Sequence, residues 1–241
     1  MRTAYTVFRN LYNVRKMTMK LVLASGSQRR RELLTMCGYD YEIIVSNADE
    51  TIDENDPESF VRALSFRKAK DVFDRLFAAG RRDFAVIGSD TVVAFQKDGG
   101  TKPVIIGKPK DAKDAVRILS MLSGKTHRVF TGVSVIADIP DENAAAQCSI
   151  REKAEIQTEC SITEVTFETL SPDEIADYVN SGDPLDKAGS YGIQGPFGMF
   201  VREIRGNYFT VIGMPIPVLY KMLKKIGILP HGFYERIEKS K

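Results

Sequence analysis

LVLASGSQRRRELL, residues 21–34, is the stretch that decides the fold. Its apolar first half ends at Ala24, three small residues follow, and a helical pattern begins at about Arg29. A strand, a short loop and a helix in this order are typical of an α/β protein. The rest of the chain continues this alternation of strands and helices.

The same signals place the other elements along the chain. Predicted strands cover residues 41–45, 84–87, 91–95, 104–106, 128–137 and 156–167. A β-hairpin is predicted from residues 200–204 and 208–212. Predicted helices cover residues 57–77, 111–123 and 217–226, and one more begins at Ser171. The Gly-rich residues 181–198 resist regular structure.

The absence of repeats and linkers in the sequence indicates the domain organisation. The chain has no internal repeat, no low-complexity tract and no linker, so we expect a single α/β domain over residues 20–228. Residues 1–19 form an N-terminal extension in this division, and residues 229–241 form a C-terminal tail. Within the domain, residues 138–151 are expected to form a long surface loop.

The composition excludes several classes of protein. The chain has 34 Lys and Arg residues and 32 Asp and Glu residues. This net charge of +2 is too small for the molecule as a whole to attract polyanions strongly. No apolar run approaches the ~20 residues that cross a bilayer, so no membrane partner is expected. Three scattered cysteines without CxxC spacing argue against a disulfide framework and for a reducing compartment. We therefore expect a cytoplasmic protein.

The N-terminal extension leaves an alternative location open. Its sequence, MRTAYTVFRNLYNVRKMTMK up to Lys20, contains five basic residues and no acidic one. An acid-free segment that carries arginines is compatible with a mitochondrial address. The other interpretation is an extension that precedes the domain and has no targeting role.

Three arginines, residues 29–31, stand where the first turn of a helix normally prefers acids. The like-sign interaction with the helix N-terminus costs about 0.3–1 kcal/mol at an exposed position. An anion bound beside the small residues that precede the helix would relieve it, because guanidinium groups match phosphate oxygens. The alternative is a solvated basic face.

Asp90 interrupts an apolar strand pattern, and a carboxylate there needs a hydrogen-bond partner, a cation or a metal. An Asx-turn at a bulge after Gly88 is the structural alternative. Lys68 falls on the apolar face of its predicted helix, where it either extends to the rim or meets an anion. Lys108 lies between a predicted strand and helix, an end-of-strand position where ligands often bind.

A metal site is predicted on oxygen ligands. Glu50 lies in an acidic loop, and hard cations such as Mg²⁺ and Mn²⁺ take carboxylate oxygens. With only two histidines in the chain, a His-based zinc site is not expected. Gly124-Lys125-Thr126 imitates the end of a phosphate-binding loop, but the required earlier glycine is replaced by Leu119, so we reject that motif.

These stretches together resemble the Maf family. LVLASGSQRRRELL is similar to its opening signature, VIGSDTVV to its central Asp-Thr motif, GKP to its lysine turn, and LSGKTHRVFTGV to its helix-to-strand segment. PLDKAGSYGIQG resembles the signature of members that act on dTTP and UTP. The match runs from about Leu21 to Leu223. Two departures are Gln28, where the family usually has proline, and an insertion over residues 96–104.

The resemblance implies a fold and a set of site residues. The fold would be a single Maf-like α/β domain with a long mixed β-sheet flanked by helices, related to the inosine-triphosphate pyrophosphatases, in a homodimer. Asp90 would be the catalytic proton acceptor, assisted by Lys68 and Lys108, and Glu50 and Asp90 would hold a divalent metal, Mg²⁺ or Mn²⁺. The residues that would bind substrate are Ser25, Arg29, Arg30, Thr91, Asp186, Lys187 and Gln194.

The activity that the resemblance implies is hydrolysis of dTTP, UTP and modified pyrimidine nucleoside triphosphates to the monophosphate and pyrophosphate. One alternative is a relative that prefers 7-methyl-GTP. Another is a catalytically silent nucleotide-binding regulator of cell division. A nucleic-acid-binding module fits the arginine cluster, but it lacks interleaved aromatics and a strongly basic balance, so no nucleic-acid partner is expected.

Overall fold

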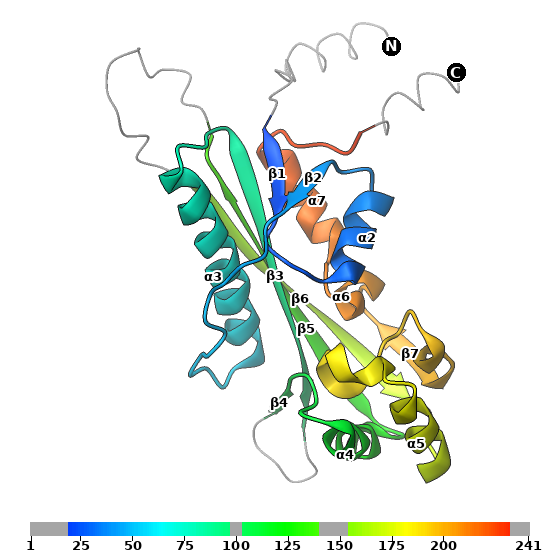
Figure 1. The fold of residues 1–241 in the computed structure, drawn as a ribbon. Coiled ribbons are helices and arrows are strands. Elements are labelled where there is room, and N and C mark those ends of the chain that lie inside the picture. Colours follow the sequence, from blue (N-terminus) through cyan, green and yellow to red (C-terminus); the bar gives the residue numbers. More distant parts are fainter. Residues whose placement is uncertain (1–18, 97–102, 140–153, 232–241) are drawn as a thin grey trace, which may run out of the picture.

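Seven strands form one mixed sheet in a computed structural model that describes residues 19–96, 103–139 and 154–231 (Figure 1). The order across the sheet is β2-β1-β3-β5-β6-β7, and β4 pairs with β3. Strands β1, β2 and β3 are parallel, and the other pairs are antiparallel. The strands are β1 (Lys20–Leu23), β2 (Tyr41–Ile43), β3 (Phe84–Phe95), β4 (Val104–Ile106), β5 (Thr126–Ala137), β6 (Glu155–Phe167) and β7 (Val201–Arg205).

Helices flank this sheet, which confirms the predicted α/β class. The α-helices are α2 (Gln28–Met36), α3 (Pro57–Ala78), α4 (Ala112–Leu122), α5 (Pro172–Asn180), α6 (Tyr208–Ile212) and α7 (Ile216–Lys225). Three 3₁₀ turns, η1 (Asp183–Asp186), η2 (Ala188–Ser190) and η3 (Pro196–Phe200), occupy the Gly-rich segment. No described helix is both long and apolar enough to cross a membrane.

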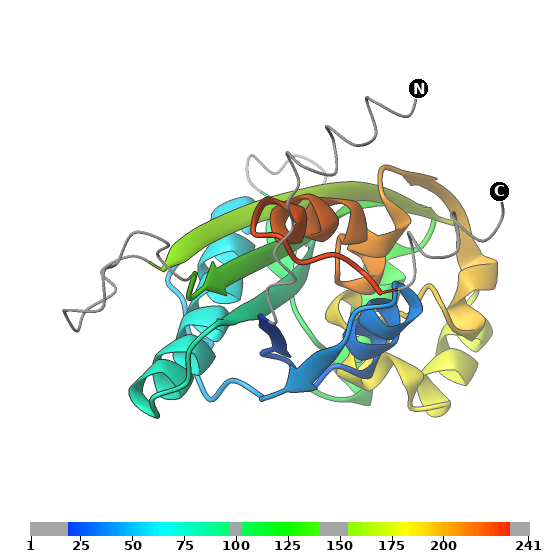
Figure 2. The ribbon, with the colours of Figure 1, turned by 90° about the horizontal axis from the view of Figure 1, so that it is seen from above.

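Strand alternation explains how both faces of β1 are covered. Leu21 and Leu23 pack into a core that also contains residues of α2 and α7, whereas Val22 packs into the core beneath α3. Figure 2 shows α3 and α2 on opposite sides of β1. A strand that is buried on both faces needs apolar residues at every position, which is why residues 21–24 form an unbroken apolar run.

Helix α3 lies unusually close to the sheet at two glycines. A Cβ at Gly88 would lie 2.1 Å from the carbonyl oxygen of Ser65, and one at Gly132 would lie 2.2 Å from that of Val61. Both glycines are therefore required for the helix backbone to rest on β3 and β5. Because side chains alternate along a strand, Asp90 faces the same helix as Gly88.

Strand β3 leaves a gap along one of its edges. One edge pairs with β5 from Ala85 to Ala94, so β1 and β4 must share the other edge. There β1 pairs with residues 84–87 and β4 with residues 93–95. Among the described residues, no strand pairs with residues 88–92 on that edge. The segment around Asp90 is therefore open where β1 ends and its loop begins.

Two predicted elements were wrong. The second arm of the expected hairpin is the short helix α6: the Asn207 side chain accepts a 2.8 Å hydrogen bond from the backbone N–H of Phe209, and Gly213 ends the helix in a left-handed conformation. These caps prevail over the β-branched and aromatic residues between them. The two strands expected on either side of residues 88–90 are one strand, β3, because the register with β5 continues without a bulge.

The Gly-rich residues 181–198, expected to resist regular structure, contain short 3₁₀ turns, and the other predicted elements agree with the structure where it describes them. Asp111 caps α4, and Ser171 caps α5 in a capping box with Glu174, as expected. The long loop expected over residues 138–151 and the insertion over residues 96–104 fall mostly outside the described residues. Residues 1–18 and 232–241 also lie outside them, so the division into extension, domain and tail stays a prediction.

Candidate active site

A cleft of about 960 Å³ opens at the gap beside β3. Its lining comes mainly from the β1–α2 loop, α2, the β2–α3 loop, α3, β3, the turn after β4, the Gly-rich segment and α6. All eleven predicted site residues line it: Ser25, Arg29, Arg30, Glu50, Lys68, Asp90, Thr91, Lys108, Asp186, Lys187 and Gln194. The structure therefore brings together residues that lie up to 169 positions apart in the sequence.

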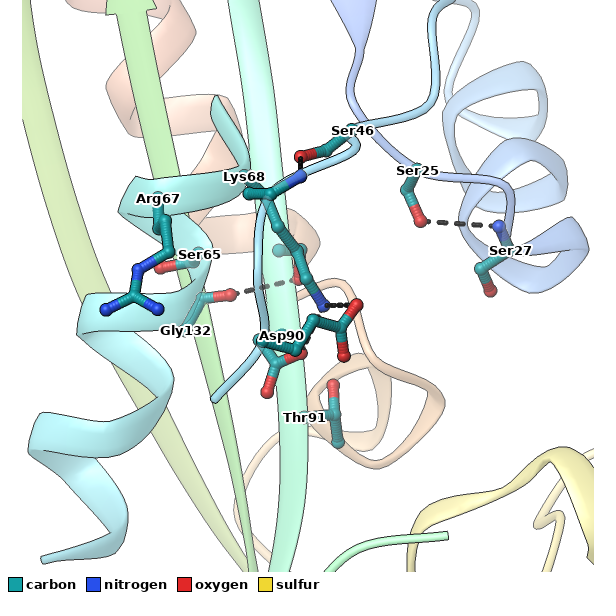
Figure 3. Close-up of polar contacts among 12 residues, drawn as sticks. Ser25, Ser27, Ser46, Ser65, Arg67, Lys68, Asp90, Thr91 and Gly132 are labelled. Atoms are coloured by element: carbon teal, nitrogen blue, oxygen red, sulfur yellow. Dashed lines mark hydrogen bonds and ion pairs between the residues drawn. The ribbon is translucent and has the colours of Figure 1, made fainter. Parts of the chain in front are cut away.

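One side of the cleft, which we call the α3 wall, consists of Glu50, Lys68 and Asp90. The ammonium group of Lys68 lies 2.7 Å from Asp90 Oδ1 and 3.0 Å from Glu50 Oε1. The side chains of Lys68 and Asp90 are each only 12% exposed, whereas that of Glu50 is 67% exposed. Figure 3 shows Lys68 reaching from α3 toward Asp90 on β3. The inward lysine thus meets an anion, the second of the two predicted possibilities.

The two carboxylates of the α3 wall could bind a divalent cation if a substrate supplied further oxygen ligands. Both contact one ammonium group, so they converge on a common point. In the described part of the chain, no group of three His, Cys, Asp or Glu residues could hold a metal ion. Mg²⁺ commonly takes one or two carboxylates and completes its shell with waters and phosphate oxygens. Glu50 and Asp90 therefore suit a metal that arrives with a phosphate chain.

Arg30 lies on the other face of β3 from Asp90, held by neutral oxygen atoms. Its guanidinium donates hydrogen bonds to the carbonyl of Gly213 (2.8 Å), to Ser25 Oγ (3.1 Å) and to Thr91 Oγ1 (3.4 Å). Burial lowers the pKa of Arg30, and the nearby Asp90 carboxylate opposes that shift. Arg30 forms no ion pair with any described residue. A half-buried guanidinium that forms no ion pair with a described residue is suited to binding an anion.

The opposite side of the cleft, which we call the η1 wall, consists of Arg29, Asp186 and Lys187. Asp186 bridges the two cations, with 2.8 Å to Lys187 Nζ and 3.4 Å to Arg29 Nη1. Burial opposes ionisation of Asp186, but the hydrogen bond from Lys187 and the charge of Arg29 outweigh it and lower the pKa of that carboxyl. Lys108 and Gln194 are exposed in the cleft and form no hydrogen bond with any described residue.

Sequence reasoning missed the residues that hold Lys187. Its ammonium also donates to the backbone oxygen (2.5 Å) and Oδ1 (2.9 Å) of Asp183, so all three of its protons are engaged. Asp183 in turn accepts a 2.5 Å hydrogen bond from the Tyr178 hydroxyl. The i, i+4 spacing of Asp183 and Lys187 is the signal that could have shown this pair.

The departure at Gln28 removes no ligand from the cleft. Gln28 is the first residue of α2, and its side-chain amide donates a 2.9 Å hydrogen bond to Glu32. The loop before it is shaped instead by Ser25, whose hydroxyl accepts from the backbone N–H of Ser27 at 3.3 Å (Figure 3). The turn that leads into α2 therefore forms without the usual proline.

Comparison with known proteins identifies the family of this chain. The family model described as "Maf-like protein" matches residues 20–226. The chain belongs to the Maf family. It is 40% identical over 217 residues to the dTTP/UTP pyrophosphatase of Agathobacter rectalis, covering 87% of this chain and 98% of the relative. It is 42% identical over 210 residues to the dTTP/UTP pyrophosphatase of Bacillus thuringiensis subsp. konkukian, covering 87% and 96%.

Proposed function

We propose that this Maf protein is a nucleoside triphosphate pyrophosphatase that hydrolyses dTTP, UTP and modified pyrimidine triphosphates to the monophosphate and pyrophosphate. The observation that carries the proposal is a single cleft in which the paired carboxylates of the α3 wall share the lining with cations from α2, the turn after β4 and the Gly-rich segment. A triphosphate needs such cations, and its hydrolysis needs carboxylates. The relatives named dTTP/UTP pyrophosphatase support the choice of nucleotide.

Asp90 would orient the attacking water and accept its proton. Its position in the cleft and its contact with Lys68 support this role. A divalent cation bound by Glu50 and Asp90 would neutralise charge on the phosphate chain. Arg30 and Lys108 would bind phosphate oxygens, and fixed cations aimed at developing charge are usually the largest contribution to catalysis. Pyrophosphate leaves as water attacks the α-phosphorus.

Arg29, Thr91 and Gln194 are proposed to select the nucleobase, and Ser25, Asp186 and Lys187 to support the phosphate end of the cleft. Lys187 acts through Asp186 in this arrangement, because its protons are already engaged. The homodimer and the cytoplasmic location also remain proposals, as does the absence of a nucleic-acid partner. A preference for 7-methyl-GTP is the enzymatic alternative, and a silent nucleotide-binding regulator is the other.

The first prediction tests the enzyme itself. Pyrophosphate release is measured with dTTP, UTP, CTP, 5-methyl-UTP, pseudo-UTP and 7-methyl-GTP, with and without Mg²⁺ or Mn²⁺. We expect dTTP and UTP to be preferred, and Asp90→Asn to lower turnover at least ~100-fold because the proton acceptor is lost. Asp74→Asn, on the exposed side of α3, serves as the control and should retain activity.

Each alternative has its own signature in this experiment. Preference for 7-methyl-GTP would contradict the proposed nucleotide but not the proposed reaction, the release of pyrophosphate. Nucleotide binding without pyrophosphate release by the wild-type protein would favour the silent regulator. Turnover by Asp90→Asn equal to that of the wild type would refute the role of Asp90.

A further inference from the structure

The loop that carries Glu50 is attached to α3 by a stripe of side chains on that helix. Arg67, Asp71 and Arg75 lie four residues apart and therefore share one face of the helix. Asp71 Oδ2 accepts hydrogen bonds from Ser46 Oγ (3.0 Å) and the backbone N–H of Asn47 (2.9 Å). Arg75 donates to the carbonyl of Val45 at 2.9 Å. The start of the loop is thus held by Asp71 and Arg75.

Arg67 holds the loop on both sides of Glu50. Its Nη1 donates to the carbonyls of Asp49 and Thr51, each at 2.8 Å. Between these two carbonyls, Asp49 Oδ1 accepts a 2.9 Å hydrogen bond from the backbone N–H of Thr51 and closes a tight turn. Glu50 is the central residue of that turn. One guanidinium nitrogen therefore fixes the backbone immediately before and immediately after the carboxylate that faces the cleft.

Among the residues that the structure describes, no other contact fixes Glu50 as firmly. Residues 44–56 contain no helix or strand, so the backbone itself supplies little restraint. The ion pair of Glu50 with Lys68 involves a carboxylate that is 67% exposed, and such pairs contribute little. Arg67 does not itself line the cleft among the described residues, whereas its neighbour Lys68 does. Figure 3 shows these two side chains leaving α3 in different directions.

We propose that Arg67 is a positioning residue that sets the affinity of the active site for its divalent cation by holding the Glu50 turn against α3. This inference rests on the proposed function, in which Glu50 is a metal ligand. Residues that orient metal ligands without touching the metal typically change its affinity 10–100-fold when they are replaced. The expected effect lies on metal binding and leaves the reaction step intact once the metal is bound.

The test replaces Arg67 by methionine, which keeps the apolar stem and removes both hydrogen bonds. Mn²⁺ binding is measured by electron paramagnetic resonance in the presence of α,β-methylene-UTP, a substrate analogue that is not cleaved. We expect the Kd for Mn²⁺ to rise about tenfold. The Mg²⁺ concentration that half-activates UTP hydrolysis should rise by a similar factor, with kcat at saturating Mg²⁺ within about twofold of the wild type.

Three further variants separate positioning from a general loss of structure. Arg67→Lys can still donate to two carbonyls, so it should restore most of the Mn²⁺ affinity. Arg75→Met removes the attachment at Val45, which is five residues from Glu50, and should change the Kd less than Arg67→Met does. Glu50→Gln should weaken Mn²⁺ binding at least as much as Arg67→Met, because it removes the ligand itself.

Equal Mn²⁺ affinity in Arg67→Met and the wild type would overturn the inference, and so would unchanged affinity in Glu50→Gln. Neither measurement requires turnover. A wild-type protein that binds Mn²⁺ and the analogue but releases no pyrophosphate would instead contradict the proposed function, and the Mn²⁺ comparison would still decide the role of Arg67.

Discussion

The two walls of the cleft carry similar charges in different surroundings. On the α3 wall, Lys68 and Asp90 are each 12% exposed and lie against the sheet. On the η1 wall, Lys187 is as buried as Lys68, but its partner Asp186 is 68% exposed. Water screens an exposed ion pair more than a buried one. The pair of Lys68 with Asp90 is therefore expected to be stronger than the pair of Lys187 with Asp186. The chemistry is expected where the charges are shielded.

The largest effect should come from Lys68 on the α3 wall. Lys68→Met leaves Asp90 and Glu50 close together without their shared cation, and we expect the free energy of unfolding without metal to fall by about 1–3 kcal/mol. Urea denaturation measures this change. The control is Lys70→Met on the same helix, where the pair with Asp74 is more than half exposed, and its effect should stay within about 0.5 kcal/mol. Equal effects would erase the distinction between buried and exposed pairs.

An intermediate effect is expected from His127, a buried residue that contacts the cleft-lining Tyr191. Its Nε2 lies 2.9 Å from the hydroxyl of Tyr191, a residue that lines the cleft, and burial lowers the pKa of His127 to about 3. The unfolded chain binds a proton below about pH 6.5 and the folded chain does not, so stability falls as pH drops from about 6.5 toward 3.

The slope of that fall is the measurable quantity. One histidine contributes up to about 1.4 kcal/mol per pH unit below pH 6.5. His127→Gln keeps a hydrogen-bonding side chain but does not titrate, so its stability should decline less between pH 6.5 and 5. This window lies above the range in which most carboxylates titrate. Identical slopes in the two proteins would show that His127 is protonated in the folded state.

The smallest effect should come from the η1 wall itself. Asp186→Asn removes the charge that bridges Arg29 and Lys187, yet we expect stability to change by only about 0–1 kcal/mol, because Asp186 is largely exposed. The difference should shrink further in 0.5 M salt. Denaturation at low and high salt measures both values. A loss as large as that for Lys68→Met would mean that the two walls are equally shielded.

The α3 wall was also the easier one to predict. Asp90 stood out because a carboxylate in an apolar strand needs a partner, and Lys68 because it faced inward on its helix. Each residue was singled out separately, and the structure shows that the two form an ion pair at 2.7 Å. The spacing that places both on facing surfaces, period 3.6 in a helix and period 2 in a strand, is local and can be read from the chain.

Apart from the i, i+4 pair of Asp183 and Lys187, the contacts of the η1 wall follow no regular sequence period. Its 3₁₀ turns contain or follow glycines in left-handed conformations, such as Gly182 and Gly189, and the long-range pair of Arg29 with Asp186 joins them to α2. Likewise, helix α6 replaced an expected strand because its two caps prevailed over the propensities of five residues. Short segments are decided by their ends and neighbours, which makes them the least predictable from composition.

The close seating of α3 on Gly88 and Gly132 has a consequence for motion. At these two points the backbone of α3 packs directly on the backbone of the sheet, and we expect this contact to restrict motion of the helix relative to the sheet. Lys68 and Asp90 thus move as parts of one stiff body. Any closure around an incoming nucleotide would then come from the opposite side of the cleft, where α2 and η1 are joined by the largely exposed ion pair of Arg29 with Asp186.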